Sequence, residues 1–417
     1  MKKNDRRARI GRGGFAYTVG MSMTPKTLMR EAEKLREKLI GWRRNLHACA
    51  EVGFELTQTT AFVRERLEEM GCAPETCGKS SLITDVGSGK TALIRADMDG
   101  LPIREKTGLS FACKKGNMHA CGHDMHTAML LGAAHILKRM EKDLPCKVRL
   151  LFQAAEETLS GAKAAIDDGV LQGVERAAML HVLTDTELPT GSVVVASAGV
   201  SAPSADYFEI TLRGKACHGS APQNGIDALQ AAAHIVIALQ ELPAREISIS
   251  DPAVITVGTF SAGNAANAIA DTATVKGTMR TFNEKGRYAL KRRIEQIAKG
   301  IGRAFRCRTG VRFLSGCPSL YNDKETSAAA EKAVRTLLGE KKTFTSKQLS
   351  GGGVEAKNGG SEDFAYISRA VPSVMLALAA GEPAKGYAYP LHHPKANFDE
   401  SVLPIGAATY AALAIWG

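Results

Sequence analysis

The sequence predicts an α/β protein in which a mostly parallel sheet is sandwiched by helices and interrupted by a smaller inserted α+β unit. Short apolar runs of strand length alternate with helical stretches, as in parallel sheets covered on both faces. One central stretch instead has the order β-α-β-β-α-β, which is typical of ferredoxin-like units. The chain has 417 residues, 44% of them hydrophobic, and is long enough for two or three domains.

The first predicted elements are helices. From Thr24 to Trp42 apolar residues recur at three- and four-residue spacing, and Pro25 suits a first helical turn. A second helix is expected over residues 59–70, ended by Gly71.

The strands of the main sheet are predicted from continuous apolar runs that polar or glycine-rich residues follow. They cover residues 92–96, 148–152, 177–180 and 371–378. Helices are expected between the first three strands, over residues 127–140 and 161–168.

The inserted unit follows a Ser/Gly/Pro-rich linker at residues 197–205. Its elements are a strand at 207–212, a helix at 226–242, strands at 253–260 and 272–282, a helix at 285–305 and a strand at 306–314. Signals of the first kind resume afterwards, so we expect a main domain at residues 24–203 and 316–417 and an inserted lid or dimerisation domain at 204–315.

Composition excludes several classes of protein. The net charge is +11, but nearly half of it lies in the first twelve residues and the remainder is diffuse, which argues against nucleic-acid binding. The apolar runs are shorter than the roughly 18–20 residues that a bilayer span needs. Nine scattered cysteines favour the reducing cytoplasm over a disulfide framework. Residues 1–23 lack a signal-peptide core and are expected to be a disordered basic extension or an upstream start, with Met21 or Met23 as the native one.

Residues of metal-ligand type follow three of the predicted strands. They are Asp97 and Asp99, Glu156 and Glu157, and His181. Open α/β sheets place their sites at the carboxyl ends of strands, so these side chains are expected to meet. Of the adjacent glutamates, one could bind a metal while the other takes a proton, although a lone Glu-Glu pair is more often a solvated turn.

A fourth group lies in the segment that opens the 127–140 helix. Cys121 and His123 could face one ion, with Asp124 orienting an imidazole from behind. A Cys-x-His pair is weak evidence by itself, but together with the glutamates it favours Zn, Mn, Co or Ni. His392 or His393 near the C-terminus adds a further candidate, for which an exposed turn is the simpler interpretation.

Several motifs together resemble the M20 metallopeptidase family, specifically its amidohydrolase branch. The resemblance covers nearly all of residues 24–417, and that branch includes hippurate hydrolases, N-acyl-amino-acid amidohydrolases, auxin-conjugate hydrolases and N-acetyl-diaminopimelate deacetylases. The motifs are WRRNLHACAEVGFEL, IRADMDGLPIRE, MHACGHDMHTAMLLGAA, LFQAAEETLSGAK and LHHPKANFDESVLPIGAA.

The resemblance implies a centre of two divalent cations. The implied ligands are Cys121, His123, Glu157, His181 and His392. Glu156 is the implied general base and later proton donor, and Asp99 the residue that orients a ligand histidine. The family pattern favours His392 over His393.

In the inserted unit, the resemblance implies three further roles. In GKACHGSAPQNGIDAL, His218 would donate to the oxyanion, reaching a neighbouring subunit's site. Asn267 and Arg280 match positions that contact the substrate's carboxylate, which suits a guanidinium. GGSEDFAYI, at residues 359–367, is expected to shape a loop near the site.

The expected activity is metal-dependent hydrolysis of N-acyl or N-aroyl amino acids to a carboxylic acid and a free amino acid, by a cytoplasmic homodimer without nucleic-acid or membrane partners. The alternatives are a dipeptidase or aminoacylase of the same family, a thiol enzyme with Cys121 as nucleophile and His123 as base, and a non-hydrolytic binding protein on this fold.

Overall fold

The structure, a computed structural model, describes residues 24–350 and 359–416, so the extension expected at residues 1–23 lies outside the described residues. The opening helices are α1 (Pro25–Lys34), α2 (Arg36–Ala48) and α3 (Thr57–Glu69). The expectation of one helix from Thr24 to Trp42 is wrong, because the helix breaks at Leu35. Leu35 keeps a backbone in the helical region (φ −91°, ψ −2°), so the apolar spacing passes through the break unchanged.

The main sheet has eight strands in the order β1-β2-β4-β3-β5-β16-β6-β15. Four of its neighbouring pairs are parallel, namely β3 with β4, β3 with β5, β16 with β5, and β15 with β6. The mostly parallel sheet is therefore confirmed. The strands are β1 (Glu75–Cys77), β2 (Ser81–Val86), β3 (Thr91–Asp97), β4 (Lys147–Gln153), β5 (Val174–Leu183), β6 (Val193–Val195), β15 (Thr343–Thr345) and β16 (Ser373–Ala379).

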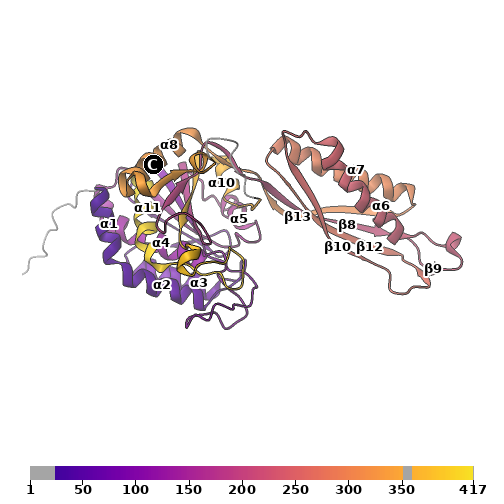
Figure 1. The fold of residues 1–417 in the computed structure, drawn as a ribbon, viewed down its shortest axis with the longest axis horizontal. Helices are drawn as coiled ribbons and strands as arrows, with labels where there is room; N and C mark the ends of the chain where they lie inside the picture. Colours follow the sequence, from indigo (N-terminus) through magenta and orange to yellow (C-terminus); the bar gives the residue numbers. More distant parts are fainter. Residues whose placement is uncertain (1–23, 351–358, 417) are drawn as a thin grey trace, which may run out of the picture.

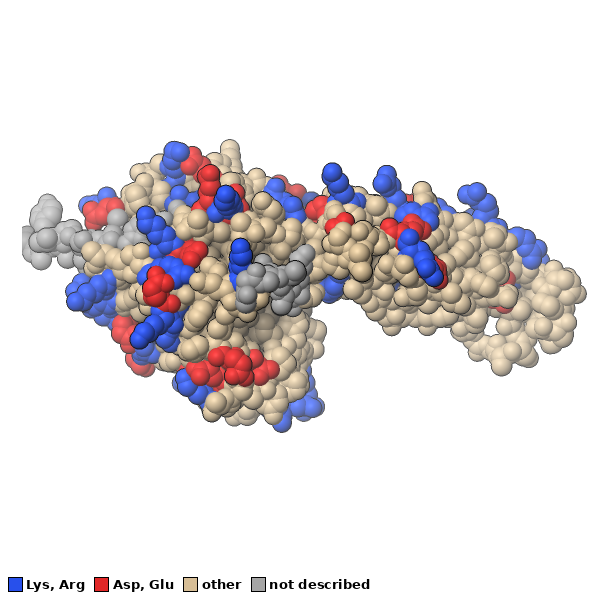
Figure 2. Space-filling view, turned by 45° about the horizontal axis from the view of Figure 1, so that its top comes forward, with Lys and Arg blue, Asp and Glu red and all other residues tan. Residues whose placement is uncertain are grey.

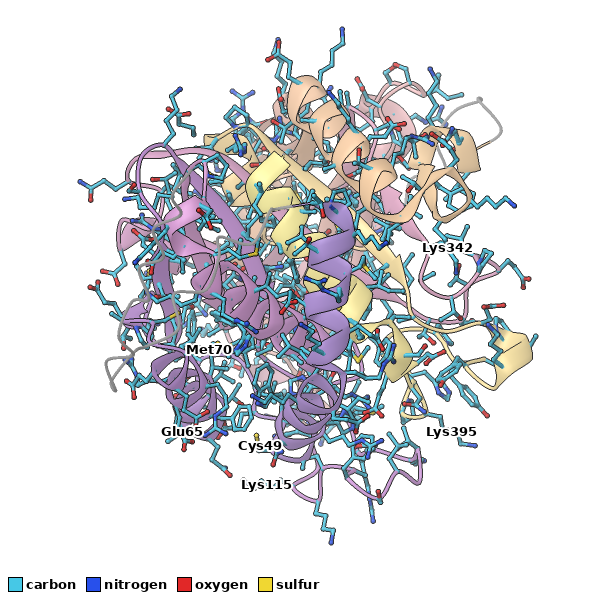
Figure 3. The ribbon with its side chains drawn as sticks, turned by 90° about the vertical axis from the view of Figure 1, so that its left-hand side faces the viewer. Cys49, Glu65, Met70, Lys115, Lys342 and Lys395 are labelled. Atoms are coloured by element: carbon cyan, nitrogen blue, oxygen red, sulfur yellow. The ribbon has the colours of Figure 1, made fainter. Side chains whose placement is uncertain are left out.

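Helices cover both faces of this sheet, as predicted (Figure 1). On one face Ile94 of β3 shares a buried core with Leu130 of α4, and on the other Leu93 shares a core with Ala162 of α5. Figure 3 views the molecule from the side of α1, which packs on α11. Besides the opening helices, the helices of the main domain include α4 (His123–Arg139), α5 (Gly161–Asp167), α8 (Lys324–Leu338), α10 (Ala365–Ala370) and α11 (Leu403–Trp416).

The inserted segment forms a second sheet with its own core, and Figure 1 shows it as a separate lobe. Its strand order is β10-β12-β8-β13, and every neighbouring pair is antiparallel. Phe208 from the sheet shares this core with Ile235 and Ile294 from two helices that pack on it. The predicted order β-α-β-β-α-β is present, whereas the domain limits 24–203, 204–315 and 316–417 stay a prediction. The elements are β8 (Ser204–Arg213), α6 (Ala228–Glu241), β10 (Ala253–Ala262), β12 (Thr272–Thr281), α7 (Glu284–Ala304) and β13 (Arg308–Cys317).

The connection between the two lobes is more ordered than a linker. Within the expected linker at 197–205, β7 (Gly199–Ala202) pairs antiparallel with β14 (Leu320–Asn322) from the returning chain. The two chain crossings therefore support each other by backbone hydrogen bonds. Composition predicts an irregular backbone here, whereas the structure has a strand, because the partner strand lies more than 100 residues away and no local pattern can show it.

The visible surface carries charges of both signs (Figure 2). Figure 2 shows basic and acidic side chains interspersed on the visible face of both lobes, without a basic stripe. Among the described helices, none is long and apolar enough to cross a membrane. All nine cysteines are free thiols.

Candidate metal centre

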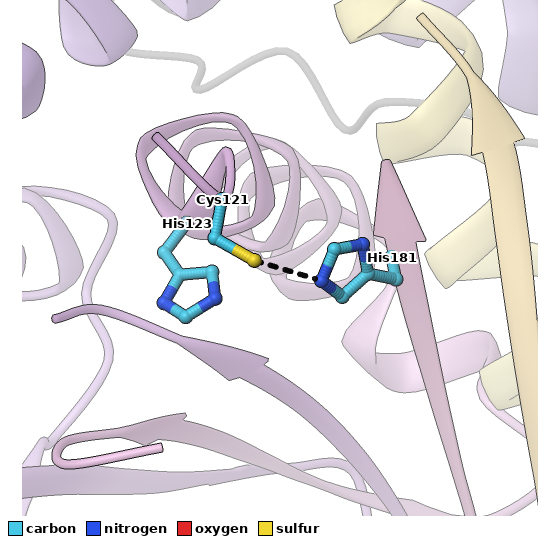
Figure 4. A group of neighbouring side chains, drawn as sticks. All are labelled: Cys121, His123 and His181. Carbon is cyan, nitrogen blue, oxygen red and sulfur yellow. Dashed lines mark hydrogen bonds between the residues drawn. The ribbon is translucent and has the colours of Figure 1, made fainter. Parts of the chain in front are cut away.

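The carboxyl ends of β3, β4 and β5 meet at one edge of the main sheet, where the predicted ligands converge. Cys121 Sγ lies 3.5 Å from His181 Nε2 and 3.3 Å from His392 Nε2. Glu157 Oε1 lies 3.6 Å from His392 Nε2 and 3.9 Å from His123 Nε2. Figure 4 shows Cys121 and His123 from the start of α4 facing His181 from β5. Four residues, as far as 271 positions from Cys121 in the chain, thus surround its sulfur atom.

The turn before α4 depends on glycine. Gly122 has φ +84°, and a Cβ at this position would overlap the side chain of Val182. A left-handed backbone and a close approach both require glycine here. Gly122 therefore lets Cys121 and His123 point toward the same space.

Backbone hydrogen bonds fix the tautomers of two histidines. His123 Nδ1 donates to the carbonyl oxygen of Asp99 at 2.9 Å, and His181 Nδ1 donates to that of Val182 at 2.7 Å. In its neutral form each ring therefore presents an unprotonated Nε2 to the centre, which is the form that binds a metal ion.

The donor set fits divalent cations. His123 Nε2 and Glu157 Oε1 are buried and have no hydrogen-bond partner among the described residues. Burial also raises the pKa of the Cys121 thiol to about 12 and that of Glu157 to about 7. Buried groups of this kind are costly without a counter-charge, which a metal ion supplies. The donor atoms form two groups, Cys121 with His123 and His181, and Cys121 with Glu157 and His392, so Cys121 could be shared between two ions.

The high pKa of Cys121 weakens the thiol-enzyme alternative. A thiolate is the reactive form of cysteine, and a thiol buried in this way is inert without a cation beside it.

Asp99 supports the centre in two ways. Its carboxylate accepts the backbone N–H groups of Glu156 at 3.1 Å and Glu157 at 3.2 Å, while its carbonyl oxygen holds His123. Asp99 therefore contacts both His123 and the backbone of the glutamate turn. Asp124 accepts a hydrogen bond from Arg43 Nε at 2.7 Å and lies 2.8 Å from Nδ1 of His47, an imidazole that is not among the five predicted ligands.

The same centre contains residues that the sequence did not single out. Arg95 is wholly buried and donates to Asp97 at 2.8 Å and to Asp363 at 2.9 Å. His126 donates from Nδ1 to Asp97 at 2.5 Å and accepts the backbone N–H of Val182 at Nε2, so it ties the ends of β3 and β5 together. A charged residue inside an apolar strand was the available signal for Arg95, but its partners come from distant segments.

Glu156 is held at the edge of this charged cluster. The backbone N–H of Asp363 donates to Glu156 Oε1 at 3.3 Å. Burial, together with the charges of Glu362 and Glu157, raises the pKa of Glu156 well above 4.5. Residues 361–364, the Ser-Glu-Asp-Phe segment, thus contact the candidate base directly, beyond shaping a loop.

A cavity of about 460 Å³ opens beside the centre, and Arg280 lines it together with Glu156 and His181. Arg280 Nη1 donates to the carbonyl oxygen of Gly359 at 2.9 Å and to Ser361 Oγ at 2.8 Å. The other two predicted residues of the inserted unit, His218 and Asn267, do not line this cavity. His218 is exposed, and Gly219 N donates to the Asn267 carbonyl at 2.7 Å, where β9 (Cys217–His218) pairs with β11 (Ala268–Ile269) at the far tip of the lobe (Figure 1).

His392 rather than His393 faces the centre. His393 stacks on Tyr389 with a ring separation of 4.5 Å, and its Nδ1 accepts the backbone N–H of Lys395. We therefore expect His392→Ala to lose at least tenfold in metal affinity and His393→Ala to keep it, because only the first removes a candidate ligand. Competition with a chromogenic chelator measures this, and the reverse order would assign the role to His393.

Known proteins are similar to this chain over most of its length. Residues 93–415 match the model of peptidase family M20/M25/M40. An N-acetyl-L-cysteine deacetylase of Bacillus subtilis is 35% identical over 378 residues, 88% of this chain and 85% of that protein. An IAA-amino acid hydrolase of Arabidopsis thaliana is 35% identical over 381 residues, 89% of this chain and 83% of that protein. A Bacillus subtilis structure described as a dinuclear metal-binding peptidase of the M20 family superposes with a TM-score of 0.74 at 31% identity, covering 92% of this chain and 98% of that one.

Proposed function

Because the chain belongs to peptidase family M20/M25/M40 and is a metal-dependent hydrolase of amide bonds, we propose that its substrates are N-acyl or N-aroyl amino acids. The products are a carboxylic acid and a free amino acid. The observation that carries this proposal is the cavity that joins the cluster around Cys121 to Arg280. One end suits a polarised amide and the other a carboxylate.

Two divalent cations, of Zn, Mn, Co or Ni type, would be held by the five ligands. Cys121 is common to both groups, His123 and His181 complete one, and Glu157 and His392 complete the other. When bound, such ions polarise an amide carbonyl and lower the pKa of water.

Glu156 is the proposed general base. Its raised pKa suits a carboxylate that accepts a proton from the attacking water and later passes it to the leaving amine. The Asp363 N–H at Oε1 fixes the orientation of the carboxylate. Arg280, already held by Ser361 and Gly359, would bind the carboxylate of the amino-acid half of the substrate.

His218 and Asn267 would act in the site of a second copy, because both lie at the tip of the inserted lobe, away from the centre of their own chain. The proposed assembly is a cytoplasmic homodimer formed through that lobe.

This arrangement predicts complementation between two inactive variants. We expect Glu156→Ala and His218→Ala each to be nearly inactive, and the mixed, reassembled pair to recover up to about a quarter of native activity. A mixed dimer has one site with both residues intact, since each site takes Glu156 from one chain and His218 from the other. Mixtures that stay inactive although mass spectrometry shows hybrid dimers would contradict a site shared between two chains. Active protein that light scattering shows to be monomeric would contradict it too.

Amino acid release from a panel of substrates tests the function. Chelator-stripped protein is assayed with N-acetyl, N-benzoyl and longer N-acyl amino acids and with dipeptides, with and without Mn, Co, Ni or Zn. We expect metal-dependent release from the acyl compounds. Preferential cleavage of dipeptides would favour the dipeptidase, and no release with any metal from folded protein would favour a binding protein.

A further inference from the structure

One wall of the cavity is part of the main sheet. His181 of β5 pairs with Ala377 of β16, and Ala377 pairs with Val194 of β6. Paired residues on neighbouring strands point to the same face, so the three side chains form a row that begins at a candidate metal ligand. All three line the cavity.

A second row lies beside the first. Met375 precedes Ala377 by two residues, Ala196 follows Val194 by two, and Ala196 N donates to the Met375 carbonyl at 3.1 Å. Both side chains also line the cavity. We call Ala377, Val194, Met375 and Ala196 the aliphatic floor. Neighbouring strands are roughly 4.8 Å apart, so the floor reaches about 10 Å from His181.

The charged residues that line the cavity, namely Arg280, Glu156, Glu157 and Glu362, are not part of the aliphatic floor. Among its described lining residues, Arg280 is the one lysine or arginine, and it belongs to β12 in the other lobe. The aliphatic floor carries no polar side chain. A carboxylate laid on the floor would be desolvated without a partner, which is costly, whereas one carboxylate beside Arg280 is matched.

We infer that the aliphatic floor binds the acyl half of the substrate and selects an uncharged, apolar acyl group larger than acetyl. This inference rests on the proposed function. We place the amino acid's carboxylate on Arg280 and the carbonyl at the metal centre. The rest of the acyl group then extends from the carbonyl carbon over the floor. The small side chains of Ala377 and Ala196 leave space above it, and each buried methylene favours binding roughly fourfold.

Four conjugates of one amino acid test the inference, namely N-acetyl, N-octanoyl, N-benzoyl and N-succinyl glycine. With metal-loaded enzyme we expect kcat/KM for the octanoyl and benzoyl compounds to exceed that for the acetyl compound at least tenfold, and the succinyl compound to be the poorest. Equal values for acetyl and octanoyl, or a preference for succinyl, would overturn the inference while leaving the proposed function intact. No hydrolysis of any conjugate would overturn both.

Two variants place the effect on the floor. Ala377→Leu fills it beside His181 and Val194→Phe fills it one strand farther, and each is expected to lower the octanoyl-to-acetyl ratio of kcat/KM at least tenfold. Ala328→Leu makes the first of these changes on the exposed side of α8, and the ratio should stay native. Circular dichroism checks folding, and Val194→Phe carries the test if the Ala377 variant does not fold. A native ratio in a folded floor variant would overturn the inference.

Discussion

Glu156→Gln should lower kcat about a thousandfold while the protein still binds its metal ions. The amide keeps the size of the carboxylate and can still face the Asp363 N–H, but it cannot accept a proton from the attacking water. The cation-binding groups around Cys121 remain complete without Glu156. Steady-state kinetics on the best N-acyl substrate gives the loss in kcat, and metal analysis after gel filtration gives the content of ions.

The matched control is Glu68→Gln, the same change on the exposed side of α3, which should leave both values unchanged. Two outcomes would contradict the assignment. A folded Glu156→Gln protein with native kcat would exclude Glu156 as the base. Loss of metal in parallel with activity would instead make Glu156 a ligand, and would move the base role to another carboxylate in the cluster, of which Glu362 lines the cavity.

The convergence of the candidate ligands was predictable because the end of a parallel strand has a known place, at one edge of the sheet. A run such as 92–96 identifies a strand, and the carboxyl ends of parallel neighbours must share one edge, so side chains that follow these runs meet without any knowledge of loops. His392 follows no such rule. Its loop is placed by tertiary contacts, and its φ of 66° is unusual for a residue other than glycine, so only the resemblance selected it.

The cavity floor was not predictable from local pattern. β6 and β15 have three residues each, too few for a period to register, and β6 runs antiparallel to β16. Val194 and Ala196 acquire a role only when the sheet brings them beside Ala377. For the same reason, composition predicts a linker where the structure has β7.

Buried charges were missed for a related reason. Arg95 stands in a strand whose seven residues are all buried, and local propensity treats it as an interruption. Its meaning depends on Asp363, 268 residues away, and on Gln153 from the next strand, which accepts from Arg95 Nε at 3.0 Å. A sequence pattern cannot show that one guanidinium satisfies several carboxylates.

Arg95→Met should therefore be among the most destabilising substitutions in the main sheet. Methionine matches the length of the stem but leaves Asp97, Asp363 and Glu362 without the cation that now lies within 3.1 Å of each. Removing one partner of a buried ion pair costs about 3–5 kcal/mol, because the other charge stays desolvated. Urea unfolding of metal-free protein, followed by circular dichroism, measures this loss of free energy without a contribution from bound ions.

Arg44→Met is the matched control, since Arg44 is 48% exposed and pairs with Glu400 at 2.7 Å. An exposed pair contributes at most about 1 kcal/mol, so this variant should unfold close to the native midpoint. Arg95→Lys keeps the charge but loses the planar fork that reaches several acceptors, and should fall between the two. If Arg95→Met unfolded at the native midpoint, the carboxylates would have to be neutral in the metal-free protein.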